Sequence, residues 1–402
     1  MKLNNLDDLV KNYGYPDALI DNHKFKNSGY ALWGFDQTLE YNNKGLYINS
    51  SKINEEPFAL LQSLIDKWMQ TNKKISAIGF LSYDIKNIIY PHINFKKIKN
   101  NFPYMWFANP KIIKSYKLAV NHNTEKTKQH LSINKDILSS KEYQEKILLI
   151  KKELKKGNSY QINFTMPKLF DINCHPFKIY LEIRKNIKPD FGYYLNIGDH
   201  YILSFSPEEF FHTKGNIIES YPMKGTKLRG SSTNEDNFFK KELKNSVKDK
   251  AEHLMIVDLL RNDIGKISQY GSVKVKNLFA VNSYPTVHQM VSCVYGQLNQ
   301  NIKHVDILKA LHPGGSITGA PKESSMKIID RLENHNRGIY TGTIGFINNV
   351  GDMCFNIAIR TLAINKNIGE YGVGGGIVWK SNPEDERNEA ELKSKILENY
   401  IN

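Results

Sequence analysis

The chain has 402 residues, of which 40% are hydrophobic and 24% charged, values typical of a globular protein that buries a sizeable core. This composition excludes a disordered, collagen-like or disulfide-scaffold protein, and no apolar run reaches the roughly 18 residues that a membrane span needs. Three widely spaced cysteines and a polar N-terminus without a signal-like apolar segment indicate a reduced, cytoplasmic chain.

The net charge is +14, from 55 Lys and Arg against 41 Asp and Glu. A positive excess of this size is found in proteins that bind nucleic acids or anionic ligands. Here the lysines are scattered along the chain, and Lys, Asn and Ile are abundant throughout, as in proteins from AT-rich genomes. We therefore expect no nucleic-acid partner, and a basic nucleic-acid-binding protein stays the alternative from a different class.

The order of the expected elements gives the fold class. The first part of the chain is predicted to contain a helix at 58–69, a strand at 77–83, a polar loop or hairpin at 120–140 and a helix at 141–156. Strands are expected next at 160–165, 192–197, 201–205, 273–279, 341–347 and 355–364, and helices at 235–265, 304–311, 322–333 and 384–399. Because strands and helices do not alternate regularly, the pattern favours an α+β fold with mostly antiparallel sheet.

Two residues in the middle of the chain are candidates for covalent and acid catalysis. Pro222 and Gly225 place Lys224 in a tight turn, where a partly desolvated lysine can lose its proton and act as a nucleophile. Glu208 directly follows the expected strand 201–205, a place from which a carboxylic acid can protonate a leaving hydroxyl. Taken singly, a solvated lysine and a capping or ion-paired glutamate are the commoner interpretations.

Two helices each carry a pair of carboxylates on one face. Asp249 and Glu252 are three residues apart in the helix expected at 235–265, and Glu386 and Glu389 repeat this spacing in the last helix. Neighbouring carboxylates repel each other unless a cation lies between them, which is the principle of a Mg²⁺ site. An ordinary charged helix surface has the same appearance in a sequence.

Glycine-rich segments provide a candidate anion site. The segment 312–322 resembles a phosphate-binding loop, but Ala320 stands where that motif requires lysine, so a nucleoside triphosphate site is rejected. The run 372–377 is predicted to be a loop whose backbone N–H groups close around a carboxylate. Arg360, expected on the strand 355–364, would add a bidentate contact. A purely structural glycine turn is the alternative.

Taken together, the motifs resemble those of the chorismate-utilising enzymes. They occur in that family's order, and the strong match runs from about 140 to 399. The matching segments are Ser-Pro-Glu at 206–208, Pro-Met-Lys-Gly-Thr at 222–226, the Asp-x-x-Glu-His helix from 249, Gly-Gly-Ser-Ile-Thr-Gly-Ala-Pro-Lys at 314–322, Tyr-x-Gly at 340–342 and the glycine run. The resemblance implies two antiparallel β-sheets in a sandwich ringed by helices. It also implies a weakly matching N-terminal region, 1–135, interlocked with a chorismate-binding catalytic domain, 136–402.

Within that family the sequence is most similar to the component I proteins of aminodeoxychorismate synthesis. Anthranilate synthases usually have alanine at the position of Lys224, and isochorismate and salicylate synthases have lysine at the position of Gln161. The resemblance implies that Lys224 attacks ring carbon C2 of chorismate, that Glu208 is the general acid, and that ammonia is the incoming nucleophile. Anthranilate synthase component I is the alternative within the family.

The resemblance also assigns roles to further residues and implies partners. Mg²⁺ is expected on Glu252 and Glu389, supported by Asp249 and Glu386. Substrate contacts are expected from Arg360, Tyr340, the N–H groups of Gly374, Gly375 and Gly376, and from His288, Thr343, Thr226 and Gln161. The expected product is 4-amino-4-deoxychorismate, a precursor of 4-aminobenzoate and folate. Because the sequence shows no glutaminase or lyase motif, we expect ammonia from a separate glutamine amidotransferase subunit.

Overall fold

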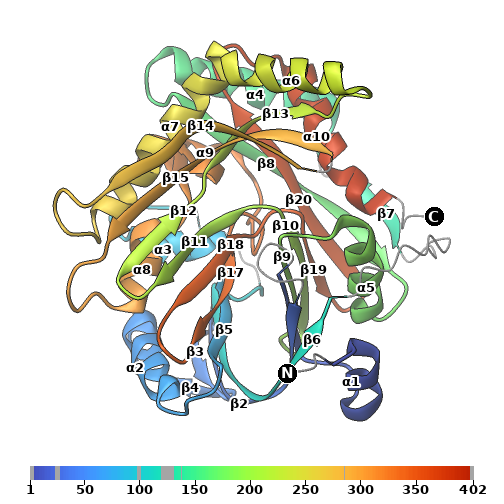
Figure 1. Ribbon diagram of the computed structural model, residues 1–402, viewed down its shortest axis with the longest axis vertical. Helices are drawn as coiled ribbons and strands as arrows, with labels where there is room; N and C mark the ends of the chain where they lie inside the picture. The colour runs from blue at the N-terminus through green and yellow to red at the C-terminus, as the bar shows by residue number, and fades with distance from the viewer. Residues whose placement is uncertain are drawn as a thin grey trace.

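The computed structural model describes residues 4–22, 28–96, 101–118, 131–136, 138–284 and 286–398. Strands fill the middle of the molecule and helices lie around them (Figure 1). The helices are α1 (Leu6–Tyr13), α2 (Pro57–Met69), α3 (Lys86–Ile89), α4 (Ser140–Lys155), α5 (Pro176–Ile187), α6 (Thr233–Asn245), α7 (Val247–Gly265), α8 (His304–Leu311), α9 (Lys322–Leu332) and α10 (Pro383–Glu398), with 3₁₀ turns at Tyr83–Ile85 and Gly315–Ile317.

The strands follow one another in short, closely connected runs. They are β1 (Ala18–Asn22), β2 (Ser28–Asn42), β3 (Gly45–Ile48), β4 (Ser51–Ile53), β5 (Ile75–Leu81), β6 (Met105–Lys117), β7 (Leu131–Asp136), β8 (Gln161–Ile172), β9 (Phe191–Asn196), β10 (His200–Ser206), β11 (Glu209–Lys214), β12 (Ile217–Ser220), β13 (Met223–Leu228), β14 (Lys274–Ser283), β15 (Val287–Gln297), β16 (Gly319–Ala320), β17 (Thr343–Asn348), β18 (Met353–Ile357), β19 (Thr361–Asn365) and β20 (Ile368–Ile377).

The pairings between these strands are antiparallel and form two sheets that meet at the long β2–β6 ribbon. One sheet runs from β2 through β1, β9, β10, β19 and β20 to β8. The other runs from β6 through β5, β17, β18, β11 and β12 to β15, which also pairs with β13 and β14. The α+β prediction and the antiparallel sandwich ringed by helices are therefore confirmed.

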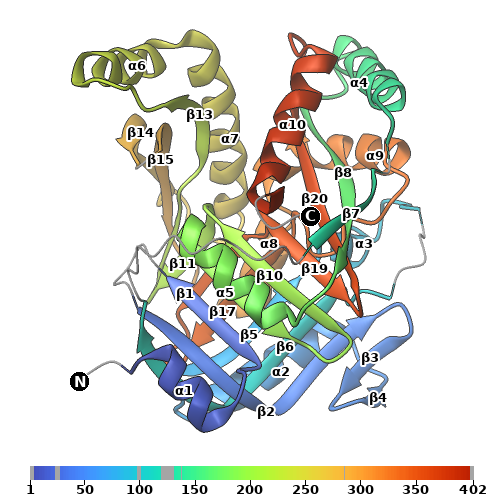
Figure 2. The same ribbon diagram turned by 90° about the vertical axis from the view of Figure 1, so that its right-hand side faces the viewer.

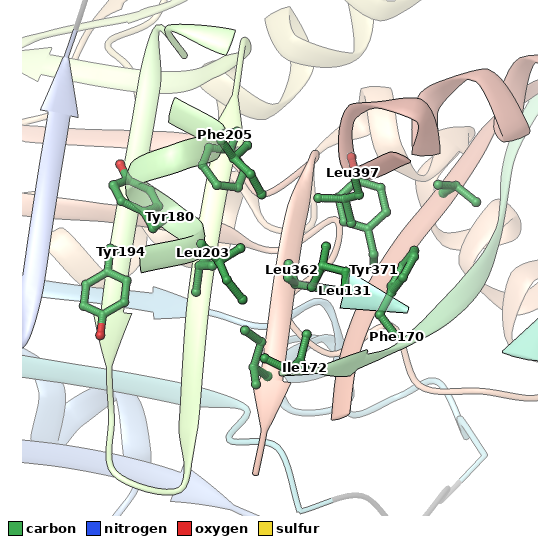
Figure 3. Close-up of a cluster of buried hydrophobic side chains, with 14 of the residues drawn as sticks. Leu131, Phe170, Ile172, Tyr180, Tyr194, Leu203, Phe205, Leu362, Tyr371 and Leu397 are labelled. Atoms are coloured by element: carbon green, nitrogen blue, oxygen red, sulfur yellow. The ribbon is translucent and has the colours of Figure 1, made fainter. Parts of the chain in front are cut away.

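Three buried clusters hold these layers together. The cluster between the two sheets includes Ile20 of β1, Phe80 of β5 and Ile344 of β17, all at most 2% exposed. A second cluster packs α4, α5, α9 and α10 against the sheet that contains β8 and β20, as Figure 3 shows around Phe170 and Tyr371. The third packs α2, α7 and α8 against the other sheet. Burial of these apolar surfaces fixes the two sheets and thereby the segments at their ends.

Several predicted elements are confirmed with their boundary signals. The helix expected at 58–69 is α2, and the one expected at 141–156 is α4, which begins with a reciprocal capping box between Ser139 and Glu142. The last helix begins at Pro383, and the Asn382 side chain accepts hydrogen bonds from the first turn. Of the segment 120–140, β7 forms the strand Leu131–Asp136, while 119–130 lie outside the described residues.

Three predictions along the chain were wrong in detail. The helix expected at 235–265 is two helices, because Ser246 leaves the helical conformation and caps α7 by accepting the Asp249 N–H. The strand expected at 355–364 is interrupted between β18 and β19, where Arg360 adopts a left-handed φ of 51° and its carbonyl accepts the Phe205 N–H. The glycine run 372–377 is part of β20 and not a loop.

The glycines of β20 are required by close approach. Residues 368–377 pair along their whole length with β8. A Cβ atom at Gly374 would lie 2.2 Å from the carbonyl oxygen of Phe164, and one at Gly376 would lie 2.8 Å from the side-chain amide of Gln161. A larger residue at Gly374 would push the strands apart, and one at Gly376 would displace the Gln161 side chain. In the described part of the chain, no helix combines the length and the apolar composition needed to cross a membrane.

Candidate active site

Two groups of elements carry the candidate residues. Figure 2 shows α6, α7 and β13–β15 on one side of the molecule and α4, α9 and α10 on the other, with β8 and β20 beside α10. The charge of Glu389 on α10 contributes to the raised pKa of Glu252 on α7, across this division. Sequence segments about 140 residues apart therefore contribute to one site.

Lys224 lies at a bulge in β13. Met223 pairs with Val291 and Thr226 pairs with Gln289, so two residues of β13 face a single residue of β15 between these pairs. Gly225 makes the bulge possible with a φ of 82°, and a Cβ atom there would lie 3.0 Å from Cβ of Asp249. The bulge places the Lys224 side chain among Glu208, Lys393, Glu252 and Glu389.

The environments of Lys224 and Glu208 shift both groups toward their neutral forms. Burial lowers the pKa of the Lys224 ammonium, although the Glu208 carboxylate opposes this shift. Burial likewise raises the pKa of Glu208, against the opposing effects of Lys224 and of a hydrogen bond of 3.2 Å that Ser316 donates to Oε1. A neutral amine beside a protonated carboxyl group is the pair that nucleophilic attack with acid-assisted departure requires.

The four predicted metal-binding carboxylates converge from α7 and α10. Burial raises the pKa of Glu252, and the charges of Asp249 and Glu389 raise it further. Burial also raises the pKa of Glu386, with Glu389 again adding to the shift. Burial acts in the same direction on Glu389, but its pKa is lowered overall because Nζ of Lys393 lies 2.8 Å from Oε1.

Lysines stand beside these carboxylates. Lys393 donates a hydrogen bond of 2.8 Å to the carbonyl of Gly374, and Lys248 lies 4.0 Å from Glu252. No three His, Cys, Asp or Glu side chains among the described residues are arranged closely enough to hold a metal ion as they stand. The donor set itself consists of four carboxylates, in which Glu389 raises the pKa of both Glu252 and Glu386, and carboxylates are the hard oxygen ligands that Mg²⁺ prefers. Its chemistry fits the predicted ion.

The residues expected to bind a carboxylate lie near the glycine strand. Gly375 faces the carboxylates that are predicted to bind the metal, since a Cβ atom there would lie 3.4 Å from Glu386 and 3.7 Å from Nζ of Lys393. Tyr340 packs against Gly372, where a Cβ atom would lie 2.2 Å from the ring. Arg360 and Tyr340 both act electrostatically on Tyr371 of β20, so the three side chains share one region.

Three other candidates are placed as follows. Gln161 begins β8, is 1% exposed and contacts Gly376, and its amide nitrogen has no hydrogen-bond partner. Thr343 is buried in β17 and donates to the carbonyl of Asn356 at 2.6 Å. Thr226 is exposed on β13 and pairs with Gln289. These three are therefore spread over a strand end, a sheet interior and a surface strand.

Lys224, Glu208, Glu252 and Glu389 are called the Lys224 group below. The structure does not bring His288 into contact with this group. Its Nε2 lies 2.9 Å from Asp236 Oδ1 and its Nδ1 lies 3.0 Å from Ser283 Oγ, so both ring nitrogens are engaged on the α6 and β14 side. In the ladder between β13 and β15, His288 faces Lys227. In this structure the ring has the surroundings of a packed, hydrogen-bonded core histidine.

A buried ion pair behind the site was missed by sequence reasoning. Arg337 donates to Glu333, to the carbonyl of Asn163 at 2.7 Å and to the carbonyl of Ile317 at 2.8 Å, while Glu333 accepts the N–H of Thr165. The pair thus connects the 3₁₀ turn that holds Ser316 with β8, the partner of the glycine strand. A Glu–Arg pair four residues apart looks the same on any solvated helix, so the sequence carries no sufficient signal for it.

Two cavities in the described part of the chain are lined by residues other than Lys224 and Glu208. One of about 530 Å³ lies between α2 and α8, where Gln62 and Lys309 contribute to its wall. Another of about 210 Å³ is bordered by Tyr340, Glu370 and Gly372. Burial raises the pKa of Glu370 to about 7. The chemistry of the Lys224 group, rather than cavity size, therefore identifies the candidate site.

Comparison with known proteins defines the class. The chorismate-binding enzyme family matches residues 16–399, and the chain belongs to this family of chorismate-utilising enzymes. In its fold it is similar to anthranilate synthase component I of Streptococcus pneumoniae, with a TM-score of 0.82, 24% identity and 92% of each chain covered.

Two relatives of known activity are similar to this chain in sequence. The chain is 35% identical over 336 residues to anthranilate synthase component 1 of Saccharolobus solfataricus, a match that covers 81% of this chain and 80% of that protein. It is 40% identical over 253 residues to aminodeoxychorismate synthase component 1 of Escherichia coli, which covers 63% of this chain and 56% of that protein. The chain thus spans just over half the length of this aminodeoxychorismate synthase relative.

Proposed function

We propose that this chain is the synthase component that aminates chorismate with ammonia to give 4-amino-4-deoxychorismate. The observation that carries the proposal is Lys224, held at the β13 bulge beside Glu208 with its pKa lowered by burial. A lysine in this state supplies a nucleophile that the alanine usual in anthranilate synthases lacks. Similarity to an aminodeoxychorismate synthase component 1 supports the same assignment.

The proposed reaction proceeds in two displacements that balance. The neutral Nζ of Lys224 bonds to C2 of the ring, the double bonds shift, and the C4–O bond breaks as Glu208 gives its proton to the departing hydroxyl, releasing water. Ammonia then bonds to C4, the bond between C2 and Nζ breaks so that Lys224 leaves as the neutral amine, and the new ammonium group returns one proton to Glu208. Nitrogen ends at C4 because two displacements return the substitution to the position that the hydroxyl left, whereas a single displacement would place it at C2.

The other predicted residues are proposed to bind the substrate and a metal ion. Glu252 and Glu389 would hold Mg²⁺, supported by Asp249 and Glu386, and the ion would neutralise the ring carboxylate of chorismate. Arg360, Tyr340 and the N–H groups of Gly374–Gly376 would bind the carboxylate of the enolpyruvyl side chain. Gln161, which cannot act as a base toward water, supports ammonia as the nucleophile.

A partner is proposed as the source of ammonia. The component 1 names of the relatives support a second component, and we infer a glutamine amidotransferase that works with this chain in the cytoplasm. A separate lyase would then convert the product to 4-aminobenzoate.

Anthranilate synthesis is the second candidate function, because the Saccharolobus relative matches over a larger share of its length. The two candidates share the substrate and ammonia and differ in the position of the nitrogen. The test supplies the purified chain with chorismate, ammonium and Mg²⁺, adds an aminodeoxychorismate lyase, and identifies the products by mass spectrometry. We expect 4-aminobenzoate that depends on the lyase. Anthranilate formed without the lyase would refute the proposal.

A further inference from the structure

One buried arginine has no role in the reaction described above. Arg337 is 3% exposed, and its guanidinium group donates two hydrogen bonds to Glu333, of 2.9 Å from Nε and 2.8 Å from Nη2. Glu333 is itself 4% exposed and also accepts the N–H of Thr165 in β8 at 2.8 Å. The buried positive charge is therefore balanced, and the other N–H groups of the guanidinium can bind neutral acceptors.

The other donors of Arg337 join two segments of backbone. Nη1 donates to the carbonyl of Ile317 at 2.8 Å and to the hydroxyl of Thr341 at 3.3 Å, and Nη2 donates to the carbonyl of Asn163 in β8 at 2.7 Å. Ile317 is the last residue of the 3₁₀ turn Gly315–Ile317. Because the guanidinium group is planar and its N–H directions are fixed, Arg337 sets the position of this turn relative to β8.

The same turn carries the hydroxyl group that contacts the proposed general acid. Ser316 immediately precedes Ile317, and its Oγ donates to Oε1 of Glu208 at 3.2 Å. On the other side of the turn, Oγ1 of Thr318 donates to the carbonyl of Gly314 at 2.8 Å. The bond from Ser316 is already longer than the usual O–H···O distance of about 2.8 Å. A small displacement of the turn would therefore be enough to break it.

We propose that Arg337 is a positioning residue, which holds the 3₁₀ turn against β8 and so keeps the Ser316 hydroxyl on Glu208. This inference rests on the proposed role of Glu208 as general acid. It assigns to Arg337 no contact with chorismate and no proton transfer. The charged side chain that acts directly on Glu208 is Lys224 of β13, so we expect the effect of Arg337 to pass through Ser316.

Three variants separate this role from a general contribution to stability. R337K keeps a positive charge beside Glu333, but an ammonium group cannot reproduce the planar fork that holds two carbonyl groups at once. S316A removes the hydroxyl itself, and the combination of R337K with S316A shows whether the two residues act through one path. R184M is the matched control, since Arg184 is another largely buried arginine and is paired with Asp21, outside the site.

The readouts are the alkaline limb of the pH profile of kcat at constant free ammonia, the melting temperature, and the pKa of Glu208 in the resting protein. Carbon-13 NMR of the glutamate carboxyl groups measures this pKa, with the Glu208 signal identified by its absence in E208Q. Loss of the Ser316 hydrogen bond destabilises the charged carboxylate, so the pKa of Glu208 should rise.

We expect R337K, S316A and the double variant to move the limb and the NMR midpoint to higher pH by the same amount, about half a unit to one unit. R184M should lower the melting temperature and leave both values unchanged. If R337K does not fold, E333Q/R337Q takes its place with the same expected shift, because it leaves no buried charge unpaired.

An unchanged limb and NMR midpoint in R337K would overturn the inference. A shift in R337K that adds in full to that of S316A, or an equal shift in R184M, would overturn it as well. Failure of the proposed function is distinguishable, because it would be seen as absence of 4-amino-4-deoxychorismate with the unmodified chain. The NMR midpoint of Glu208 in the resting protein would still test the role of Arg337.

Discussion

Nζ of Lys393 lies 2.8 Å from Oε1 of Glu389, one helical turn away on α10. The lysine partly neutralises the group of carboxylates to which Mg²⁺ is proposed to bind, and it also holds the carbonyl of Gly374 on the neighbouring strand. An arriving divalent cation must therefore compete with an internal one. The dependence of activity on Mg²⁺ therefore tests whether these carboxylates bind a metal ion.

Removal of metal should abolish turnover. We expect an excess of EDTA to stop the reaction of chorismate with ammonium, and excess Mg²⁺ to restore it. E252A and E389A should lose at least about a hundredfold in kcat at saturating chorismate, because the transition state would lose its counter-charge. The matched control is E384A, an exposed carboxylate in the first turn of the same α10. Full activity in EDTA would contradict the metal proposal.

The isolated chain should use ammonium and not glutamine. Burial raises the pKa of Cys174 and of Cys293, so neither thiol is activated as a glutaminase nucleophile would be. We expect the initial rate with ammonium chloride to rise between pH 7 and 9, as the share of free ammonia increases, and no product with glutamine alone. The comparison uses matched nitrogen concentrations. Rapid glutamine-driven turnover by the pure chain would be incompatible with a separate ammonia source.

The hydrogen bond from Ser316 should set the alkaline limit of the reaction. It stabilises the charged form of Glu208 and so lowers a pKa that burial raises. In S316A the pKa of Glu208 should rise further, and the carboxyl group should stay protonated to higher pH. We expect the alkaline limb of the pH profile of kcat to move to higher pH, measured at constant free ammonia. An unchanged limb would exclude Glu208 as the group that titrates there.

A buried ion pair far from Lys224 should support the fold. Asp21 of β1 accepts hydrogen bonds from Tyr180 at 2.8 Å and from Arg184 at 2.9 Å, both on α5, and it also binds Tyr116 of β6. R184M would leave this carboxylate buried without its cation, and we expect a loss of about 3 kcal/mol in the free energy of unfolding. Urea titrations can measure it. The exposed pair Lys227–Glu242 gives the control, since K227M should cost less than about 1 kcal/mol.

Local signals in the sequence were sufficient to predict helices whose ends are fixed by capping residues next to them in the sequence. The capping box of α4 and the Asn382–Pro383 start of α10 are such cases. The strand expected through Arg360 and the loop expected for the glycine run were wrong, because these conformations depend on partners distant in the sequence. The backbone of Arg360 binds Phe205, and Gly372–Gly376 lie against β8. No window around either segment contains those partners.

The candidate site shows the same division. Acidic pairs at i and i+3 predict only that two carboxylates share a helix face. The proximity of the pair on α7 to the pair on α10 follows from how the two groups of elements that carry these helices pack in the folded chain. The family resemblance supplied that convergence in advance. It did not supply the ion pair between Glu333 and Arg337 or the contact between His253 and Ser292, because buried and exposed polar residues look alike in one sequence.

The covalent role of Lys224 is tested most directly by the mass of the protein after it is mixed with chorismate and Mg²⁺ without ammonia. The account predicts a chain that carries chorismate less one water, with the added mass on the peptide that contains Lys224, and its disappearance when ammonium is added. K224A should carry no such mass. An unmodified chain at every quench time, in an enzyme that forms product as soon as ammonium is supplied, would contradict the account.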